Sequence, residues 1–481
     1  MKSLSLNAAL GLLAAAAAAA NIVPAGTGAV AAAPGPASNA AASPREIADS
    51  VSQERIRALV ETLVGFGTRH TLSSQTDPRR GIGAALKWTE AEFGRYARAC
   101  GGCLRTVTPS DVVTGRRVPA PTRVTDVIAI QRGSVDPNRV VIISGHIDSR
   151  VTDVMNATAD APGANDDGSG TAAVIEAARV LSMHKFPYTI VYAALMGEEQ
   201  GLLGGKVLAD YAKAQGWEVI AQLNNDIIGN SCGSDGLCDD AHVRVLSEGP
   251  RWQGHEDLAA RQRSLGGEND APSRNISRWM DRLAGDLSLG LDVRQIWRND
   301  RFGRGGDHTE MLNLGYPAVR ISVAIENYNW QHQDLRTENG IQYGDTIDKM
   351  DFPYLTKVVK LNVAALAALA RAPQPPEPAV EGAVSTDTVL AWAAVKGAAG
   401  YIVRWRRTDA ADWEHSVRHP AASCRAADAA AAPCRVTLPH VRVDDWVFGV
   451  SSVSADGYDS PVASAVPGGA FRPYTPPPAQ P

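Results

Sequence analysis

Strand-length apolar segments alternate with helical segments between residues 127 and 370, and this alternation constrains the fold more than any other feature of the chain. The apolar segments lie at 127–130, 140–144, 189–195, 219–223 and 318–323. Segments with helical periodicity lie at 51–63, 83–96, 170–181, 202–215 and 355–370. Continuous apolar strands separated by helices indicate a largely parallel sheet with both faces covered. We therefore predict an α/β fold in which a mostly parallel mixed sheet carries helices on both faces.

The pattern changes after a proline-rich segment at 373–378, which we interpret as a stiff linker. Beyond this linker, apolar residues recur at every second position in 389–392, 401–406 and 446–450, as in strands with one buried face. The stretches Gly-Tyr-Ile-Val-Arg-Trp and Trp-Val-Phe-Gly-Val-Ser resemble a fibronectin type III domain. A small all-β sandwich is therefore expected over 379–467, followed by a disordered tail at 468–481.

The N-terminus has the composition of a secretory signal peptide. Lys2 provides the positive start, and the apolar run 8–20 follows it. This run is shorter than the roughly 20 residues that a membrane-spanning helix needs. No membrane span is therefore expected, and an N-terminal anchor is the alternative. We predict a signal peptide at 1–33, a flexible spacer at 34–48, and a secreted or periplasmic protein.

Six cysteines form three close pairs along the chain: Cys100 with Cys103, Cys232 with Cys238, and Cys424 with Cys434. An even number of cysteines in an exported chain indicates disulfide bonds. Six cysteines allow fifteen pairings, of which pairing between sequence neighbours is the simplest. For Cys100-Gly-Gly-Cys103, a redox or zinc-binding motif is the alternative.

The charge of the chain argues against nucleic acid as a partner. The net charge is only -5, and the sequence contains no run of basic residues. It also contains no glycine-rich loop of the kind that binds phosphate groups.

Histidine and acidic residues follow the ends of predicted strands or precede a predicted helix. In chain order they are His146, Asp148, Asp166, Glu198, Glu199, Asp226 and His332. Because ligands of open α/β sheets gather beyond the carboxyl ends of the strands, we expect these side chains to converge. Imidazole and carboxylate groups are common zinc ligands. Five of them would complete the ligand set of two ions that share one carboxylate, and Glu198 is left free to act as a base. These five are His146, Asp166, Glu199, Asp226 and His332.

Three stretches around these residues carry a resemblance to a known family. They are Ser-Gly-His-Ile-Asp-Ser, Pro-Gly-Ala-Asn-Asp-Asp-Gly-Ser-Gly and Met-Gly-Glu-Glu-Gln-Gly-Leu-Leu-Gly. With them, the chain resembles metallopeptidase family 28, which includes secreted di-zinc aminopeptidases. The resemblance implies a zinc exopeptidase fold, with a peptidase domain at 49–372 that binds two Zn²⁺ ions.

The resemblance also implies how the ligands divide between the two ions. Asp166 would bridge both ions. His146 and Asp226 would complete one site, and Glu199 and His332 would complete the other.

Residues next to these ligands in the sequence are the candidates for catalytic roles. The resemblance implies that Glu198 is the general base, and we expect Asp148 to hold the first imidazole in one tautomer. Related aminopeptidases often carry a tyrosine just before the last histidine, where this chain has Gln331. Tyr328 and Arg304 are therefore the candidates for oxyanion or substrate contacts.

The predicted function is hydrolysis of the N-terminal residue of peptides with a free N-terminus. A zinc carboxypeptidase or dipeptidase is the alternative, for which Arg298, Arg301 and Arg304 could bind a terminal carboxylate. A non-catalytic binding protein, acting through its C-terminal module, is the alternative from another class.

Three features have less defined roles. The C-terminal module is expected to be a spacer or to dock on polymer or protein surfaces. The polar segment 229–277 is expected to form a lid or a pocket wall, and His308 to support the site without binding metal.

Overall fold

The computed structural model describes residues 42–251, 256–424 and 434–466. The predicted signal peptide at 1–33, most of the predicted spacer and the predicted tail at 468–481 lie outside these residues. The described residues form one compact unit.

The prediction of a flexible spacer at 34–48 is wrong at its C-terminal end. Pro44–Ala48 forms helix α1, and Ile47 and Ala48 are buried in the main core. The Ser43 hydroxyl accepts from the Glu46 amide, and the Glu46 carboxylate accepts from the Ser43 amide. This reciprocal capping fixes the first turn even in a very short helix.

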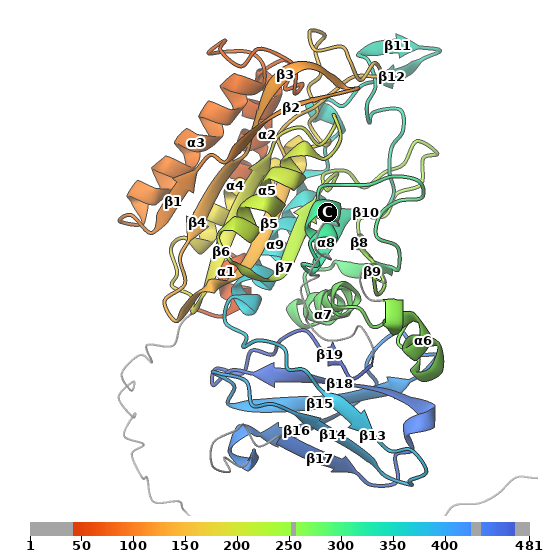
Figure 1. Cartoon of the computed structure of the whole chain (residues 1–481). Helices are drawn as coiled ribbons and strands as arrows, with labels where there is room; N and C mark the ends of the chain where they lie inside the picture. Colours follow the sequence, from red (N-terminus) through yellow and green to blue (C-terminus); the bar gives the residue numbers. More distant parts are fainter. Residues whose placement is uncertain (1–41, 252–255, 425–433, 467–481) are drawn as a thin grey trace, which may run out of the picture. The chain divides into compact units, whose positions relative to one another are not determined.

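An eight-stranded sheet is the centre of the fold (Figure 1). Its strands, in spatial order, are β1 (Leu104–Val107), β4 (Val127–Gln131), β6 (Tyr188–Leu195), β5 (Asp136–His146), β7 (Glu218–Asn225), β10 (Ala318–Val323), β8 (His242–Ser247) and β9 (Asp292–Ile296). Strands β6, β5, β7 and β10 run parallel, and so do β8 and β9. The pairs β1–β4, β4–β6 and β10–β8 are antiparallel. The sheet is therefore mixed with a parallel centre, which confirms the predicted fold class.

Helices cover both faces of this sheet (Figure 1). One face packs against α1, α2 (Gln53–Gly65), α3 (Ile82–Ala99), α4 (Gly168–Leu181), α7 (Pro272–Leu287) and α9 (Phe352–Leu369). The other packs against α5 (Leu203–Ala214) and α8 (His308–Asn313). Along β5, Val141 and Ile143 join the first core, whereas Val140 and Ile142 join the second. Complete burial of such a side chain contributes about 1.5–3 kcal/mol, so both faces of the strand stabilise the fold.

Helix α9 belongs to this core. Within the described part of the chain it alone has the length and composition of a membrane span, and 78% of its window is buried inside the protein.

The segment 229–277 is not a separate lid. It contains β8, which pairs with β10 on one side and β9 on the other, as well as α6 (Glu256–Leu265) and the start of α7. Its polar composition hid the strand, because His242 and Arg244 interrupt the apolar residues of β8. Two hairpins, β2 (Ser110–Gly115) with β3 (Val118–Thr125) and β11 (Arg336–Glu338) with β12 (Ile341–Tyr343), and the short helix η1 (Ile347–Lys349) complete this part.

Two antiparallel sheets follow α9 and enclose a core of their own, as the alternating pattern predicted. The first contains β13 (Ala379–Glu381), β14 (Thr388–Trp392) and β17 (Cys434–Leu438). The second contains β16 (His415–Pro420), β15 (Gly400–Arg407), β18 (Trp446–Val453) and β19 (Ala463–Ser464). Trp392, Tyr401 and Phe448 lie between them. Short helices η2 (Ala421–Ser423) and η3 (Val443–Asp445) lie in the connections.

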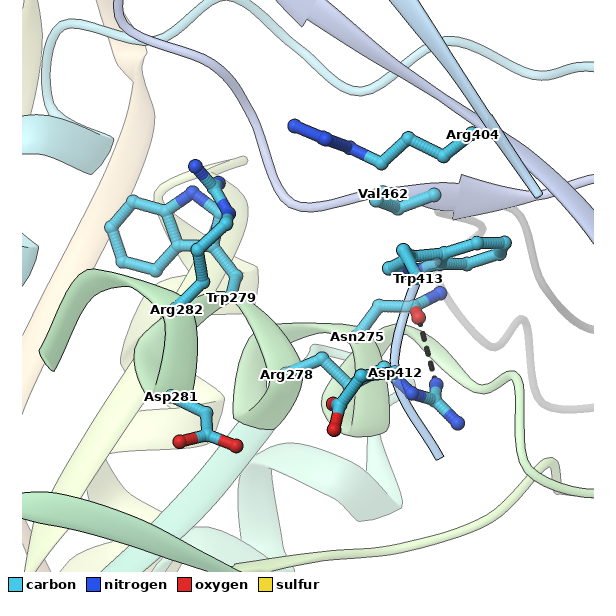
Figure 2. A pocket seen from close by; sticks show the side chains of 9 residues that line it. All are labelled: Asn275, Arg278, Trp279, Asp281, Arg282, Arg404, Asp412, Trp413 and Val462. Carbon is cyan, nitrogen blue, oxygen red and sulfur yellow. Dashed lines mark hydrogen bonds between the residues drawn. The ribbon is translucent and has the colours of Figure 1, made fainter. Parts of the chain in front are cut away.

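The second of these sheets is bound to α7 and the loop before it. Arg406 forms a buried ion pair with Asp270 at 2.6 Å, and the Ser464 hydroxyl donates to the same carboxylate. A pocket of about 280 Å³ lies beside this contact. Figure 2 shows Trp279 and Arg282 of α7 on one side of it and Arg404 and Trp413 on the other. The proline-rich segment at 373–378 is itself largely buried, so it is packed against the protein rather than extended into solvent.

All three disulfides join sequence neighbours. They are Cys100–Cys103, Cys232–Cys238 and Cys424–Cys434. The zinc alternative for the first pair has no support in the structure, because both of its sulfurs are engaged in the disulfide.

Candidate metal centre

The carboxyl ends of the central strands bring the predicted ligands together. His146 is the last residue of β5, and Asp226 follows the last residue of β7. Glu199 lies in the turn after β6, and His332 lies in the loop after β10. Asp166 precedes α4 by two residues. All five side chains converge, as the position of their residues at strand and helix ends predicted.

The five side chains form two groups of three that share Asp166. In the first group, His146 Nε2 lies 3.1 Å from Asp166 Oδ1 and 3.8 Å from Asp226 Oδ1. In the second, His332 Nε2 lies 2.8 Å from Asp166 Oδ2 and 2.9 Å from Glu199 Oε1. The ligand atoms of each group lie within 4.8 Å of one another. We call these groups the His146 triad and the His332 triad.

The two carboxylate oxygens of Asp166 face different triads. Its backbone amide donates to Asp345 Oδ2 at 2.7 Å, and the Gln331 side chain donates to Asp166 Oδ2 at 3.2 Å. Burial raises the pKa of Asp345 to about 7, against the effect of the amides of Asp166 and Asn165. Asp166 is therefore held from its backbone and from one oxygen, with its two carboxylate oxygens directed to different triads.

The residues present fit a divalent cation such as zinc. Within the described chain, His146 Nε2 and Glu199 Oε1 are buried and have no hydrogen-bond partner. Although burial opposes it, Glu199 and Asp166 raise the pKa of the His332 imidazole to about 10, so these carboxylates strongly attract positive charge. Imidazole nitrogen and carboxylate oxygen are ligands that zinc prefers, and a buried carboxylate cluster needs a cation to balance it.

Comparison with known proteins agrees with this geometry. The sequence profile of Peptidase family M28 matches residues 126–352. A "Probable zinc metalloprotease" of Leptosphaeria maculans is 43% identical over 425 residues, which cover 87% of this chain and 96% of that protein. Another, from Pyricularia oryzae, is 43% identical over 429 residues, which cover 87% of this chain and 83% of that one. The chain belongs to peptidase family M28.

This M28 zinc metalloprotease also has similar solved structures. The LapA aminopeptidase of Legionella pneumophila matches with a TM-score of 0.48 and 20% identity, over 67% of this chain and 73% of that chain. A likeness of this size supports no argument about activity.

Asp148 joins the first triad to the turn that carries Glu198 and Glu199. Its Oδ1 accepts from the amides of Gly197 and Glu198 at 2.9 and 3.2 Å, and its Oδ2 accepts from the amide of Glu199 at 3.2 Å. The imidazole Nδ1 of His146 lies 3.1 Å from the Asp148 carbonyl oxygen. Asp148 therefore orients the imidazole through its backbone, and its carboxylate positions the Glu198–Glu199 turn.

Asp167 was missed by the sequence reasoning, yet it connects three parts of the M28 site. Its side chain accepts from the amides of His146 at 2.9 Å, Gly170 at 2.9 Å and Ile227 at 3.3 Å. These amides belong to the end of β5, the start of α4 and the residue after Asp226. The signal in the sequence was an aspartate directly before a helix, which is a favoured N-cap.

Two arginines that the sequence reasoning did not assign contact the carboxylates of Asp226 and Glu199, each of which belongs to one triad only. Arg320, on β10, is fully buried and pairs with Asp226 Oδ1 at 2.7 Å and Asp300 Oδ2 at 3.2 Å. Burial alone would raise the pKa of Asp226, but Arg320 and His146 lower it. Arg150 Nε pairs with Glu199 Oε2 at 2.8 Å.

The remaining candidates form no hydrogen bond or ion pair with the two triads within the described residues. Tyr328 has 60% of its surface exposed, and Arg304 pairs with Glu326 at 3.9 Å. Within the described residues, neither side chain has a hydrogen bond or ion pair with the five ligands. His308 is buried, and its Nε2 lies 2.6 Å from the Asn299 carbonyl oxygen; its supporting role stays a prediction.

Proposed function

We propose that this M28 protease is an exopeptidase with two zinc ions, and that it removes the N-terminal residue of peptides. One observation carries the proposal. Asp166 directs one oxygen to the His146 triad and the other to the His332 triad. Two separate ligand groups joined by one carboxylate are the arrangement that a pair of ions requires.

Bound zinc would be held by the two triads, where it lowers the pKa of water and polarises a carbonyl. The chain itself supplies the proton transfer. Glu198 belongs to neither triad, and its backbone is fixed by Asp148. We assign it as the base that takes a proton from the attacking water and returns it to the leaving amine.

The surroundings of Glu198 suit this role. Burial raises the pKa of its carboxyl group well above the usual value, and the negative charges of Asp226, Glu199 and Asp307 act in the same direction. A carboxylate with a raised pKa accepts a proton more readily at neutral pH.

Cleavage at the N-terminus is favoured by the charges around the site. A carboxypeptidase needs a cation for the terminal carboxylate, and the candidates were Arg298, Arg301 and Arg304. Arg301 pairs with Asp300 and Glu326, and Arg304 also pairs with Glu326. These two cations are therefore partly neutralised, whereas zinc held by the triads could bind the nitrogen of a free α-amine.

The other parts of the chain fit an exported enzyme. Three disulfides are typical of secreted proteins. For the C-terminal module, a three-stranded and a four-stranded antiparallel sheet support the fibronectin type III-like assignment. We propose that this module, attached to α7, docks on polymer or protein surfaces.

The test combines metal content with a substrate panel. Purified protein should contain two zinc ions per chain and should hydrolyse amino-acid arylamides but not the N-blocked forms. Cleavage of N-blocked peptides from the C-terminus would favour a carboxypeptidase, and cleavage of dipeptides alone would favour a dipeptidase. A protein that binds zinc but hydrolyses none of these substrates would contradict the exopeptidase assignment.

A further inference from the structure

The pocket of about 280 Å³ in Figure 2 shares no lining residue with the two triads and takes no part in the proposed chemistry. Helix α7 and the C-terminal module each contribute part of its lining. The indoles of Trp279, from α7, and Trp413, from the module, are its apolar walls. Sites for drug-sized ligands have volumes of about 300–1,000 Å³, so this pocket suits a smaller molecule.

One end of the pocket carries two carboxylates without a counter-ion. Gln295 Nε2 donates to Asp281 Oδ2 at 2.7 Å and to Asp412 Oδ1 at 2.8 Å, so the two carboxylates lie close together. In the part of the chain that the structure describes, neither forms an ion pair. Arg278, which also lines the pocket, donates to neutral oxygen atoms, one of them Oδ1 of Asn275 at 2.9 Å. Burial raises the pKa of Asp281, and the charge of Asp412 acts in the same direction. We call Asp281 and Asp412 the acidic end, which attracts a cationic group.

The other end carries more positive than negative charge. Arg404 Nη2 and Arg282 Nη2 pair with the same atom, Asp459 Oδ2, at 2.5 and 2.7 Å, so one carboxylate balances two guanidinium groups. Arg282 Nη1 also lies 3.9 Å from Asp286 Oδ2, but both side chains are exposed, and such a pair contributes little. We call Arg282 and Arg404 the basic end, which Figure 2 shows above the acidic end. The donors of a guanidinium group match the oxygens of a carboxylate.

We propose that this pocket binds a free α-amino acid with an apolar side chain. The ammonium group of the amino acid lies at the acidic end and its carboxylate at the basic end, while its side chain packs between the indoles of Trp279 and Trp413. A simple anion satisfies the basic end alone, and a simple cation satisfies the acidic end alone. The inference goes beyond the proposed function, because binding here needs neither zinc nor Glu198. An enzyme that removes N-terminal residues would itself release such molecules.

The experiment is isothermal titration calorimetry of the full zinc-loaded chain with L-leucine. Three analogues each lack one feature: N-acetyl-L-leucine lacks the ammonium group, L-leucinamide lacks the carboxylate, and glycine lacks the apolar side chain. We expect each analogue to bind at least about tenfold more weakly than L-leucine, because a charged hydrogen bond or a buried side chain is lost. L-leucine should also raise the unfolding temperature, since it binds the folded chain only.

Two matched variants locate the binding. Asp412 is exposed, and Asp412→Asn removes the charge while keeping the shape of the side chain. Asp409→Asn is the control, because Asp409 lies in the same loop, pairs with Arg407 at 3.9 Å and does not line the pocket. We expect Asp412→Asn to weaken L-leucine binding at least about tenfold, and Asp409→Asn to change it by less than about twofold. Zinc content and arylamide hydrolysis, measured on the same samples, should be unchanged in both variants.

Three results would overturn the proposal. The first is L-leucine binding no tighter than that of any one of the three analogues. The second is binding that Asp412→Asn leaves within about twofold of the wild type, since the amino acid would then lie elsewhere, for example at the zinc ions. The third is no binding at about 10 mM L-leucine. Should Asp412→Asn not fold, Asp281→Asn removes the other charge of the acidic end, with the same expected loss. Failure of the proposed function shows in zinc content and arylamide hydrolysis, so the two failures are distinguishable.

Discussion

Replacement of Glu198 by alanine tests the proposed chemistry most directly. The variant removes a carboxylate that belongs to neither triad and leaves the backbone amide that donates to Asp148 Oδ1 at 3.2 Å. The adjacent amides of Gly197 and Glu199 also donate to Asp148, so the turn is held at three points. We therefore expect the position of Glu199 and the zinc content to be unchanged.

The expected loss of activity follows from the role of the carboxylate. General acid–base catalysis contributes about 10²–10⁴ to a rate, which corresponds to about 3–5 kcal/mol of activation free energy. Because Glu198 would act in the transition state and not in substrate binding, the loss should appear in kcat, with KM nearly unchanged.

The assay is arylamide hydrolysis at saturating substrate, with zinc measured on the same sample. Glu199→Ala serves as the comparison, since it removes a ligand of the His332 triad and should lower zinc content together with activity. A Glu198→Ala protein with full zinc and a kcat within about threefold of the wild type would refute the assignment of the base.

Other parts of the structure give three further predictions. Asp166→Ala should weaken the binding of both zinc ions, whereas Asp226→Ala should weaken one, as zinc titration would show; equal effects would contradict a bridging role. Arg406→Met should lower the free energy of unfolding by roughly 3–5 kcal/mol in urea, because it leaves the buried Asp270 charge unpaired; a change below about 1 kcal/mol would mean that the C-terminal module is loosely attached. Burial raises the pKa of Asp307 to about 7, above the value of about 3.9 in an unfolded chain. The unfolded state therefore binds fewer protons in this interval, and the stability of the metal-free protein should fall as pH rises from about 4 to about 7. Asp307→Asn should remove part of this fall, on the order of 4 kcal/mol at most, and parallel stability curves for the two proteins would contradict it.

The part of the site that follows from local sequence could be predicted. His146 ends an apolar strand, Asp226 directly follows one and Glu199 lies in the turn after another. The carboxyl ends of parallel strands meet at one edge of the sheet. The alternation that predicts the strands therefore also predicts where these side chains meet. Strand β8 escaped the same reasoning because its apolar residues alternate with His242 and Arg244, and the helix α1 escaped because it is only one turn long.

The groups that orient the ligands come from distant parts of the chain, and periodicity does not reveal them. Asp345 binds the Asp166 amide from 179 residues away, and Arg150 reaches His332 across 182 residues. Arg320 did leave a local signal, since it is a charged residue in the otherwise uncharged strand Ala318–Val323. A charge on a buried central strand needs a buried partner of opposite sign. Such a residue beside a predicted carboxylate cluster therefore indicates an ion pair with one of the ligands, which is the contact that Arg320 makes with Asp226.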